Sequence, residues 1–273
     1  TWPEPFRELL RTPQHLQVFL NRFNATGKAD TFRSYHLMLD ELWRRVIQDS
    51  TERDLLYQLT EYLIGNEILW APLAQFEEQQ EVIAALELKG ILQSQDGRIG
   101  FRHQTLLEHA KARLFARQDK SLCRYVVDDH QQAMFVRPTV WAVLQYLRDV
   151  YPGKYRVELE ELFDAKLRLH LRYLLIEFLG QLPDPEDYEI ALLAQRLLAE
   201  EDRLRVLIAV RGNAKWFHAL RASHFPTVMQ GPADQQWPMI GVIADAWDLA
   251  RDECIGLVER HWLPDPERDG LTW

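Results

Sequence analysis

The sequence predicts a mainly α-helical protein that contains one small β-hairpin. Apolar residues recur at steps of three and four along most of the 273-residue chain, as they do on one face of an amphipathic helix. Asp96-Gly97 lies between two short apolar segments, and an Asp-Gly pair suits the tight turn of a hairpin. After residue 115 no strand pattern follows, and roughly eight helical segments are separated by Pro, Gly or Asp. The strands are therefore expected only around residues 91–101.

Helices and one extended segment are expected before the hairpin. Pro13 suits the first position of a helix, where Thr12 can act as the N-cap. Gly65 suits the end of a later helix. A helix, a short strand, a helix and a hairpin in this order are typical of a winged helix. The expected helices span residues 5–12, 13–23, 31–47, 51–64 and 79–88, and the extended segment spans residues 68–70.

His103 lies where the hairpin ends and the next helix begins. The apolar period changes there from two to about 3.6. A side chain at such a junction can lie beside the unpaired amides of a helix N-terminus, which favour a phosphate. The same position also suits a histidine that only caps the helix, or a core histidine bonded to a carbonyl. The spacing alone does not separate these interpretations.

The second half of the chain is expected to be a series of helix pairs. Each predicted helix has a single apolar stripe, and antiparallel pairs stacked in a row bury such stripes, as in HEAT-like solenoids. The acidic runs at residues 158–164 and 184–189 are expected to be solvated. The helices are expected at residues 136–151, 171–182, 187–200, 203–210, 214–222, 235–250 and 253–262.

The composition indicates a soluble, cytoplasmic protein. With 47% hydrophobic residues, the chain can bury a core. Its formal net charge of -9 does not favour a surface that neutralises nucleic-acid phosphates. Its two cysteines, Cys123 and Cys254, lie far apart, so we expect neither a disulfide framework nor a CxxC metal site. No apolar run approaches the roughly 18 residues of a membrane span. Because the chain begins without methionine, we expect it to be part of a longer protein.

Several segments of the first half resemble one protein family. Residues 100–109, GFRHQTLLEH, resemble the F-x-H-x-(S/T)-aromatic-x-(E/D) element in the winged helix of STAND NTPases, especially the NACHT-like ones. Residues 10–16, LRTPQHL, resemble the proline-containing turn that opens the helical lid of that family. Residues 134–138 and 144–148 resemble the helical continuation of its bacterial members. The resemblance implies a helical lid at residues 1–50, a winged helix at 51–117 and HEAT-like repeats at 118–273.

The resemblance also implies a nucleotide. In this family the winged-helix histidine contacts the β-phosphate of ADP, and the lid proline packs on the adenine side; His103 and Pro13 match these positions. The chain departs from the pattern at Leu106 and Leu107, where aromatic residues are usual. It also contains neither a P-loop GxxxxGK(S/T) nor an acidic Walker B strand. We therefore expect no enzymatic activity in this segment, and expect ATP or ADP to be held tightly only when an NTPase core is present.

The resulting hypothesis is a regulatory segment of a signal-transducing STAND ATPase, which acts as a nucleotide-sensing clamp between the NTPase core and a sensor region. The expected partners are that core, an unidentified protein trigger or effector, and further copies on activation, as in bacterial antiviral defence. The alternative is a non-enzymatic helical-repeat scaffold for protein interactions.

Two further interpretations are less favoured. A winged helix can bind DNA, and basic residues lie on the wing and the next helix, but Asp96 and Glu108 lie among them. A zinc site is not expected, since His103 and His109 are six residues apart and six residues rotate a helix by about 240°. The basic residues concerned are Arg98, Arg102, Lys111, Arg113 and Arg117.

Overall fold

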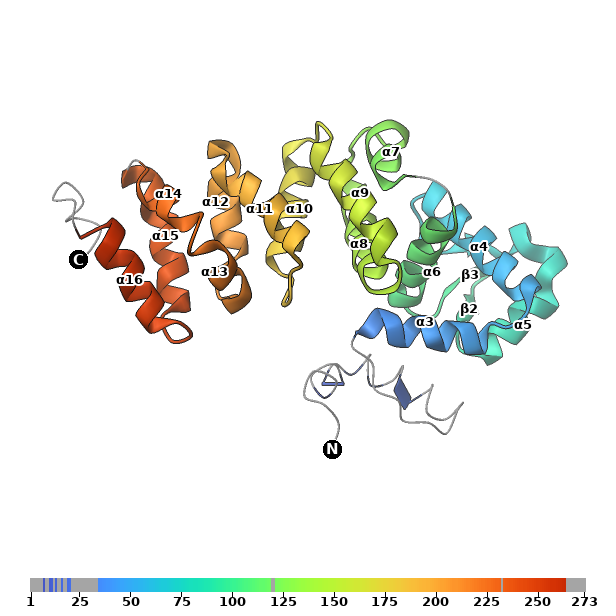
Figure 1. Ribbon diagram of the computed structural model, residues 1–273. Coiled ribbons are helices and arrows are strands. Elements are labelled where there is room, and N and C mark those ends of the chain that lie inside the picture. The colour runs from blue at the N-terminus through green and yellow to red at the C-terminus, as the bar shows by residue number, and fades with distance from the viewer. Residues whose placement is uncertain are drawn as a thin grey trace. The chain divides into compact units, whose positions relative to one another are not determined.

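The computed structural model confirms a mainly α-helical fold with a small β-hairpin (Figure 1). The chain divides into two compact units, residues 1–159 and residues 160–273. No helix in the described part of the chain combines the length and the apolar character that crossing a membrane requires. The structure describes residues 7, 10, 11, 13, 16, 19 and 20 and the ranges 34–118, 121–231 and 233–263.

The expected domain boundaries at 50/51 and 117/118 stay predictions. The helices expected at residues 5–12 and 13–23 lie mainly outside the described residues, and so does the expected cap Thr12. The extended segment expected at residues 68–70 lies slightly later, as a strand of residues 71–72.

In the first unit, helices precede and follow the small sheet. Ser34 caps the first described helix by accepting a hydrogen bond from the amide of Leu37, and Asp49 caps the second by accepting one from Thr51. The elements are α3 (Tyr35–Val46), α4 (Ser50–Gly65), β1 (Ala71–Pro72), the 3-10 helix η1 (Leu73–Gln79), α5 (Gln80–Leu88), β2 (Leu92–Gln95), β3 (Arg98–Phe101), α6 (Gln104–Arg117), α7 (Leu122–Arg124), the π-helix η2 (Tyr125–Asp129), the 3-10 helix η3 (Met134–Val136) and α8 (Arg137–Val150).

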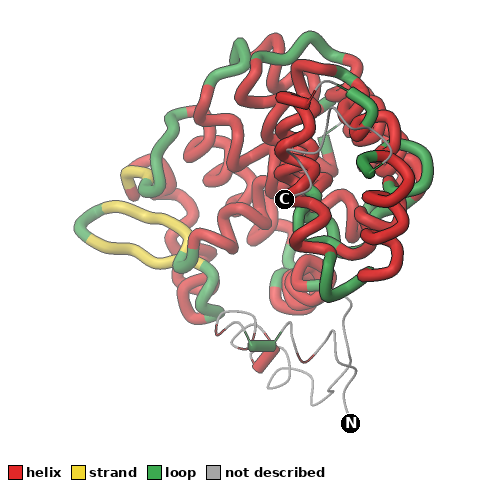
Figure 2. The backbone as a smooth tube through the Cα atoms, turned by 90° about the vertical axis from the view of Figure 1, so that its left-hand side faces the viewer, coloured by secondary structure: helices red, strands yellow, loops and turns green. Residues whose placement is uncertain are grey.

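The described strands form one antiparallel sheet in the order β1-β3-β2. Figure 2 shows β2 and β3 side by side, joined by a tight turn. Asp96 and Gly97 both have positive φ in this turn, as predicted. Pro72 lies on the edge strand β1, where its missing N–H removes no inner ladder bond. The absence of a side chain at Gly100 lets the backbone just before β1 lie close to β3, because a Cβ at residue 100 would lie 2.8 Å from the carbonyl oxygen of Leu69.

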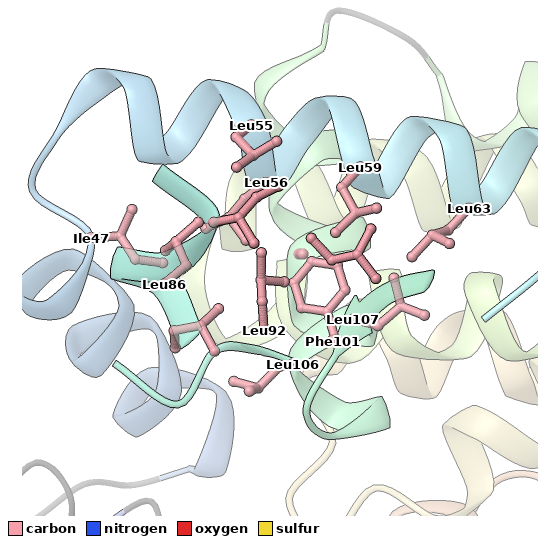
Figure 3. Close-up of a cluster of buried hydrophobic side chains, with 14 of the residues drawn as sticks. Ile47, Leu55, Leu56, Leu59, Leu63, Leu86, Leu92, Phe101, Leu106 and Leu107 are labelled. Atoms are coloured by element: carbon pink, nitrogen blue, oxygen red, sulfur yellow. The ribbon is translucent and has the colours of Figure 1, made fainter. Parts of the chain in front are cut away.

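The core of the first unit lies between α4, the sheet and α6. Leu55, Leu59 and Leu63 from α4 point towards Phe101 and Leu107 (Figure 3). These α4 leucines are members of the apolar stripe that the periodicity of residues 51–64 predicts. Burial of such side chains contributes roughly 1.5–3 kcal/mol each.

The helix α9 (Pro152–Asp164) runs across the division between the units. It contains Glu158, which belongs to an acidic run that the sequence predicts to be solvated. Instead Glu158 is buried, and its carboxylate accepts a hydrogen bond of 2.6 Å from the backbone amide of Leu122. Glu189 in the second acidic run is also buried, as the reciprocal partner in a capping box with Glu186.

The second unit is built from helices that pack in layers. Helices α10 and α12 pack side by side, α12 packs in turn against α15, and α11 packs against α12 and α13 (Figure 1). Contacts near both ends show that α10 and α12 run parallel: Arg172 bonds Glu201 near their starts, and Gly180 lies against Ala209 near their ends. The bounds are α10 (Leu169–Gly180), α11 (Asp187–Leu198), α12 (Glu200–Ala209), α13 (Ala214–Leu220), α14 (Phe225–Met229), α15 (Ala233–Ala246) and α16 (Arg251–His261).

Candidate functional site

His103 is the N-cap residue of α6 and lies two residues after the end of β3. Its backbone is extended, and its carbonyl accepts a hydrogen bond of 3.0 Å from the amide of Leu106. Its side chain is exposed, and among the described residues no side chain caps the helix at this end. His103 is therefore not a core histidine. It presents an imidazole to solvent beside a helix N-terminus, where the macrodipole favours negative charge.

The start of α3 lies beside the start of α6. The Tyr35 hydroxyl, from the first residue of α3, lies near the side chain of Thr105 in the first turn of α6. Burial raises the pKa of Tyr35 above its ordinary value, so the phenol stays neutral at physiological pH. Arg102, the neighbour of His103, is exposed. Two exposed nitrogen-bearing side chains, Arg102 and His103, thus precede the first turn of α6.

Pro13 is described as an exposed helical residue. The residues on either side of it, 12 and 14, lie outside the described residues. How Pro13 lies relative to His103 therefore stays a prediction.

Several residues that follow His103 on α6 are buried in the hydrophobic core of the first unit. Leu106 and Leu107, which stand where the resembling family has aromatic residues, are buried with Phe101 in the core of the first unit (Figure 3). His109 is buried, whereas His103 is exposed. The two imidazoles lie in different environments, as their separation of six helical residues predicts.

A second cluster of chemical interest is centred on Asp40, which the sequence analysis did not single out. Asp40 lies on α3 with only 3% of its surface exposed. Its Oδ1 atom accepts hydrogen bonds from Arg113 Nη1 on α6 and, at 2.8 Å, from the Tyr146 hydroxyl on α8. Its Oδ2 atom lies 2.7 Å from Arg44 Nη2, one turn later on α3. One carboxylate thus joins three helices that also pack pairwise against each other.

His109 lies next to this carboxylate without a hydrogen bond to it. Its Nε2 atom is 3.9 Å from Asp40 Oδ1, and neither ring nitrogen has a hydrogen-bond partner in the described part of the chain. The ring lies between Trp43 and Tyr146, with both ring centroids 5.3 Å away. Burial, reinforced by the charge of Arg113, holds the pKa of His109 well below its ordinary value. His109 is therefore neutral at physiological pH.

Arg113 and Tyr146 are held in their ordinary charge states. Burial opposes the charge of Arg113, but Tyr146 and Asp40 outweigh it and raise the pKa of the guanidinium. Burial raises the pKa of the Tyr146 phenol far above its ordinary value. Arg113 and Asp40 make a buried ion pair, and the neutral Tyr146 supplies the carboxylate with a further donor. Removing one partner of such a pair typically costs about 3–5 kcal/mol, because the other charge stays buried.

One signal in the sequence points weakly to Asp40. The apolar stripe predicted for the helix at residues 31–47 includes Leu39 and Trp43. Asp40 follows Leu39 and lies three residues before Trp43, so it belongs to the same face of the helix. A carboxylate in an apolar stripe needs a buried donor. The donors lie 73 and 106 residues away, at Arg113 and Tyr146, so no local pattern identifies them.

Comparison of the chain with protein-family models, with curated proteins and with solved structures finds no match.

Proposed function

We propose that this chain is the regulatory part of a signal-transducing STAND-type ATPase, in which it senses the nucleotide held by a separate NTPase core. The observation that carries the proposal is the exposed imidazole of His103 at the N-cap of α6. An imidazole N–H, the amides of a helix N-terminus and the neighbouring guanidinium of Arg102 are all donors suited to a phosphate oxygen.

The packing around this position supports a clamp. Tyr35 at the start of α3 lies near Thr105 in the first turn of α6, and the two helices pack against each other. Further along the same two helices, Asp40 bonds Arg113, and Tyr146 of α8 bonds the same carboxylate. A displacement of α6 by a phosphate at His103 therefore pulls on α3 and α8 together. Two arrangements of these helices, one favoured by ADP, would make the nucleotide a switch.

The chain contains no P-loop of its own, so the proposal assigns ATP binding and hydrolysis to the core. The core, a protein trigger or effector, and further copies of the protein are the proposed partners, in the cytoplasm. We propose that this segment senses the nucleotide because its contacts with the core differ between the ADP-bound and the ATP-bound state.

DNA binding by the winged helix is not favoured, because its basic residues have other roles. Arg113 bonds the buried Asp40, and the guanidinium of Arg117 lies over the ring of Tyr57, 4.7 Å from its centroid. Burial lowers the pKa of Lys111, which is consistent with partial removal of its amine from solvent. Few of the cations that a duplex would need remain available.

The test uses the longer protein that contains both this chain and the proposed NTPase core. The rate at which fluorescently labelled ADP dissociates is measured for the wild type, for His103→Ala, and for His218→Ala as a control at an exposed histidine of α13. Loss of one hydrogen bond to a charged phosphate costs about 1.5 kcal/mol, so His103→Ala should release ADP about tenfold faster.

An equal dissociation rate for wild type and His103→Ala would contradict the proposal. So would a longer protein in which no Walker A motif accompanies this chain. In either case the alternative, a helical-repeat scaffold without a nucleotide, would be preferred, and the exposed surface of the second unit is the feature that favours it.

A further inference from the structure

His109 is a buried histidine whose ring is covered by side chains of two other helices. The residue is 2% exposed, and its ring on α6 lies between Trp43 of α3 and Tyr146 of α8, with both ring centroids 5.3 Å away. Trp43 belongs to the core cluster of the first unit, whereas Tyr146 does not. Solvent therefore reaches His109 most easily when Tyr146 moves away together with the helix that carries it.

Helix α8 packs against α3 and α6 but lies outside that core cluster. The cluster takes its members from residues 39–110, and none of the buried side chains of α8 is among them. Separation of α8 would therefore leave the leucines of α4, the sheet and the start of α6 packed together. Its cost would be the contacts of α8 itself, which include the hydrogen bond from Tyr146 to Asp40.

The carboxylate of Asp40 is not free to stabilise a protonated His109 while α8 is packed. Arg113 bonds its Oδ1 atom, and Arg44 Nη2 lies 2.7 Å from its Oδ2 atom. His109 Nε2 lies 3.9 Å from Oδ1, which is too far for a hydrogen bond. A proton on His109 would thus add a third cation to one buried carboxylate, and a buried charge without a hydrogen bond is costly.

The other titratable groups around the ring do not offset this cost. His36 of α3 has its ring centroid 6.4 Å from that of Tyr146, and the buried Tyr57 of α4 lies near Arg113. An imidazole and a phenol bring no negative charge near neutral pH. Burial, followed by the charges of Arg113 and His36, holds the pKa of His109 well below its ordinary value. The packed arrangement therefore excludes a proton that an exposed histidine binds near pH 6.5.

We propose that His109 is a proton sensor beneath α8. When α8 separates from α3 and α6, Tyr146 uncovers the ring and His109 takes up a proton, so that acid favours the separated arrangement. The ratio of separated to packed molecules should rise about tenfold from pH 7.5 to pH 5.5, a range that lies above the ordinary titration of carboxyl groups. The inference requires no nucleotide and holds or fails independently of the proposed function.

The experiment measures amide hydrogen exchange of the full chain by mass spectrometry at pH 7.5, 6.5 and 5.5, with each rate corrected for the pH dependence of exchange in an unfolded peptide. Peptides from α8 should exchange about tenfold faster at pH 5.5 than at pH 7.5 after this correction. Peptides from β2 and β3 should show no such rise, because the core cluster stays packed. Peptides from α10 serve as the reference from the second unit.

Two substitutions that remove the titrating group, His109→Phe and His109→Gln, should abolish the acid-dependent rise in α8. The matched control is His36→Gln, which removes the other histidine near Tyr146 and should keep the rise. Circular dichroism at pH 7.5 establishes that each variant is folded. The comparison of α8 with β2 and β3 in the wild type needs no variant, so the test stands even where a substitution at His109 prevents folding.

Four results would overturn the proposal. The first is a corrected exchange rate of α8 that does not change with pH in the wild type. The second is an equal rise in β2 and β3, which would mean that the whole unit unfolds in acid. The third is a rise that persists in a folded His109 variant, and the fourth is a rise that His36→Gln abolishes, which would assign the proton to His36.

Discussion

The hydroxyl of Tyr146 donates a hydrogen bond of 2.8 Å to the carboxylate of Asp40, although 106 residues separate the two in sequence. Because Arg113 bonds the same oxygen, a single buried acceptor connects α3, α6 and α8. Such a junction is sensitive to substitution, since each donor left behind is buried.

Asp40→Asn should destabilise the first unit strongly. The amide can still accept from Tyr146, but the charge of Arg113 then stays buried without a counter-ion. We expect the free energy of unfolding to fall by about 3 kcal/mol. Urea unfolding followed by circular dichroism measures it. Asp54→Asn, at an exposed position of α4, is the control and should change stability by less than about 0.5 kcal/mol. Similar losses in both variants would show that the Asp40 pair has no special role.

Tyr146→Phe should have a smaller effect than Asp40→Asn. The ring keeps its packing against His109, and only the hydroxyl donor is lost while Arg113 remains on the carboxylate. The expected loss is about 1 kcal/mol. Tyr151→Phe, which alters an exposed tyrosine, is the matched control in the same urea series. A loss for Tyr146→Phe as large as that for Asp40→Asn would mean that the hydroxyl contributes as much as the ion pair to the stability of the site.

His109 should make stability depend on pH. Its pKa in the folded protein lies well below 6.5, mainly because of burial, whereas the unfolded chain binds the proton near pH 6.5. The unfolded state therefore takes up more protons on acidification, and the free energy of unfolding falls as pH drops below about 6.5. The slope approaches about 1.4 kcal/mol per pH unit until the folded pKa is reached.

His109→Phe retains a ring between Trp43 and Tyr146 and removes this titration. Unfolding free energies measured from pH 7.5 to pH 5 should fall less steeply for His109→Phe than for the wild type, whereas His218→Gln, at an exposed histidine, should keep the wild-type slope. Parallel slopes for the wild type and His109→Phe would place the pH dependence elsewhere.

The sequence predicts features that depend on neighbouring residues, and it misses those that depend on distant ones. The leucine stripe of α4 and the Asp96-Gly97 turn follow from local periodicity and backbone preference, and the position of His103 at the start of α6 follows from both. The burial of Asp40 and Glu158 does not follow from local patterns, because their donors belong to other elements. Tyr146 is on α8, and the amide that bonds Glu158 is at the start of α7. Charged residues in a helical pattern look alike whether they face solvent or a distant donor.

Gly100→Ala should weaken the pairing of β1 with β3. The new Cβ would lie 2.8 Å from the carbonyl oxygen of Leu69 and 3.2 Å from the Trp70 ring, and the first of these is backbone that cannot turn aside. We expect a loss of about 2 kcal/mol, seen as a lower midpoint in thermal unfolding. Gly153→Ala on α9 meets nothing within 4 Å and should leave the midpoint unchanged or raise it slightly. The opposite order of the two midpoints would show that the segment before β1 does not lie against Gly100.

Gly180→Ala should disturb the parallel packing of α10 and α12, and a second substitution can show why. A Cβ at residue 180 would lie 2.6 Å from the Cβ of Ala209, but also 2.6 Å from its carbonyl oxygen and 2.7 Å from its carbonyl carbon. Removing the methyl group in the double variant Gly180→Ala/Ala209→Gly relieves only the first of these contacts. We therefore expect Gly180→Ala to lower the free energy of unfolding by about 2–3 kcal/mol, and the double variant to remain as unstable, because the backbone of α12 is still in the way and a glycine near the helix end adds a further cost of up to about 1 kcal/mol. Recovery of wild-type stability in the double variant would show that the two helices meet through side chains alone and that their backbones are further apart than the contact at Gly180 indicates.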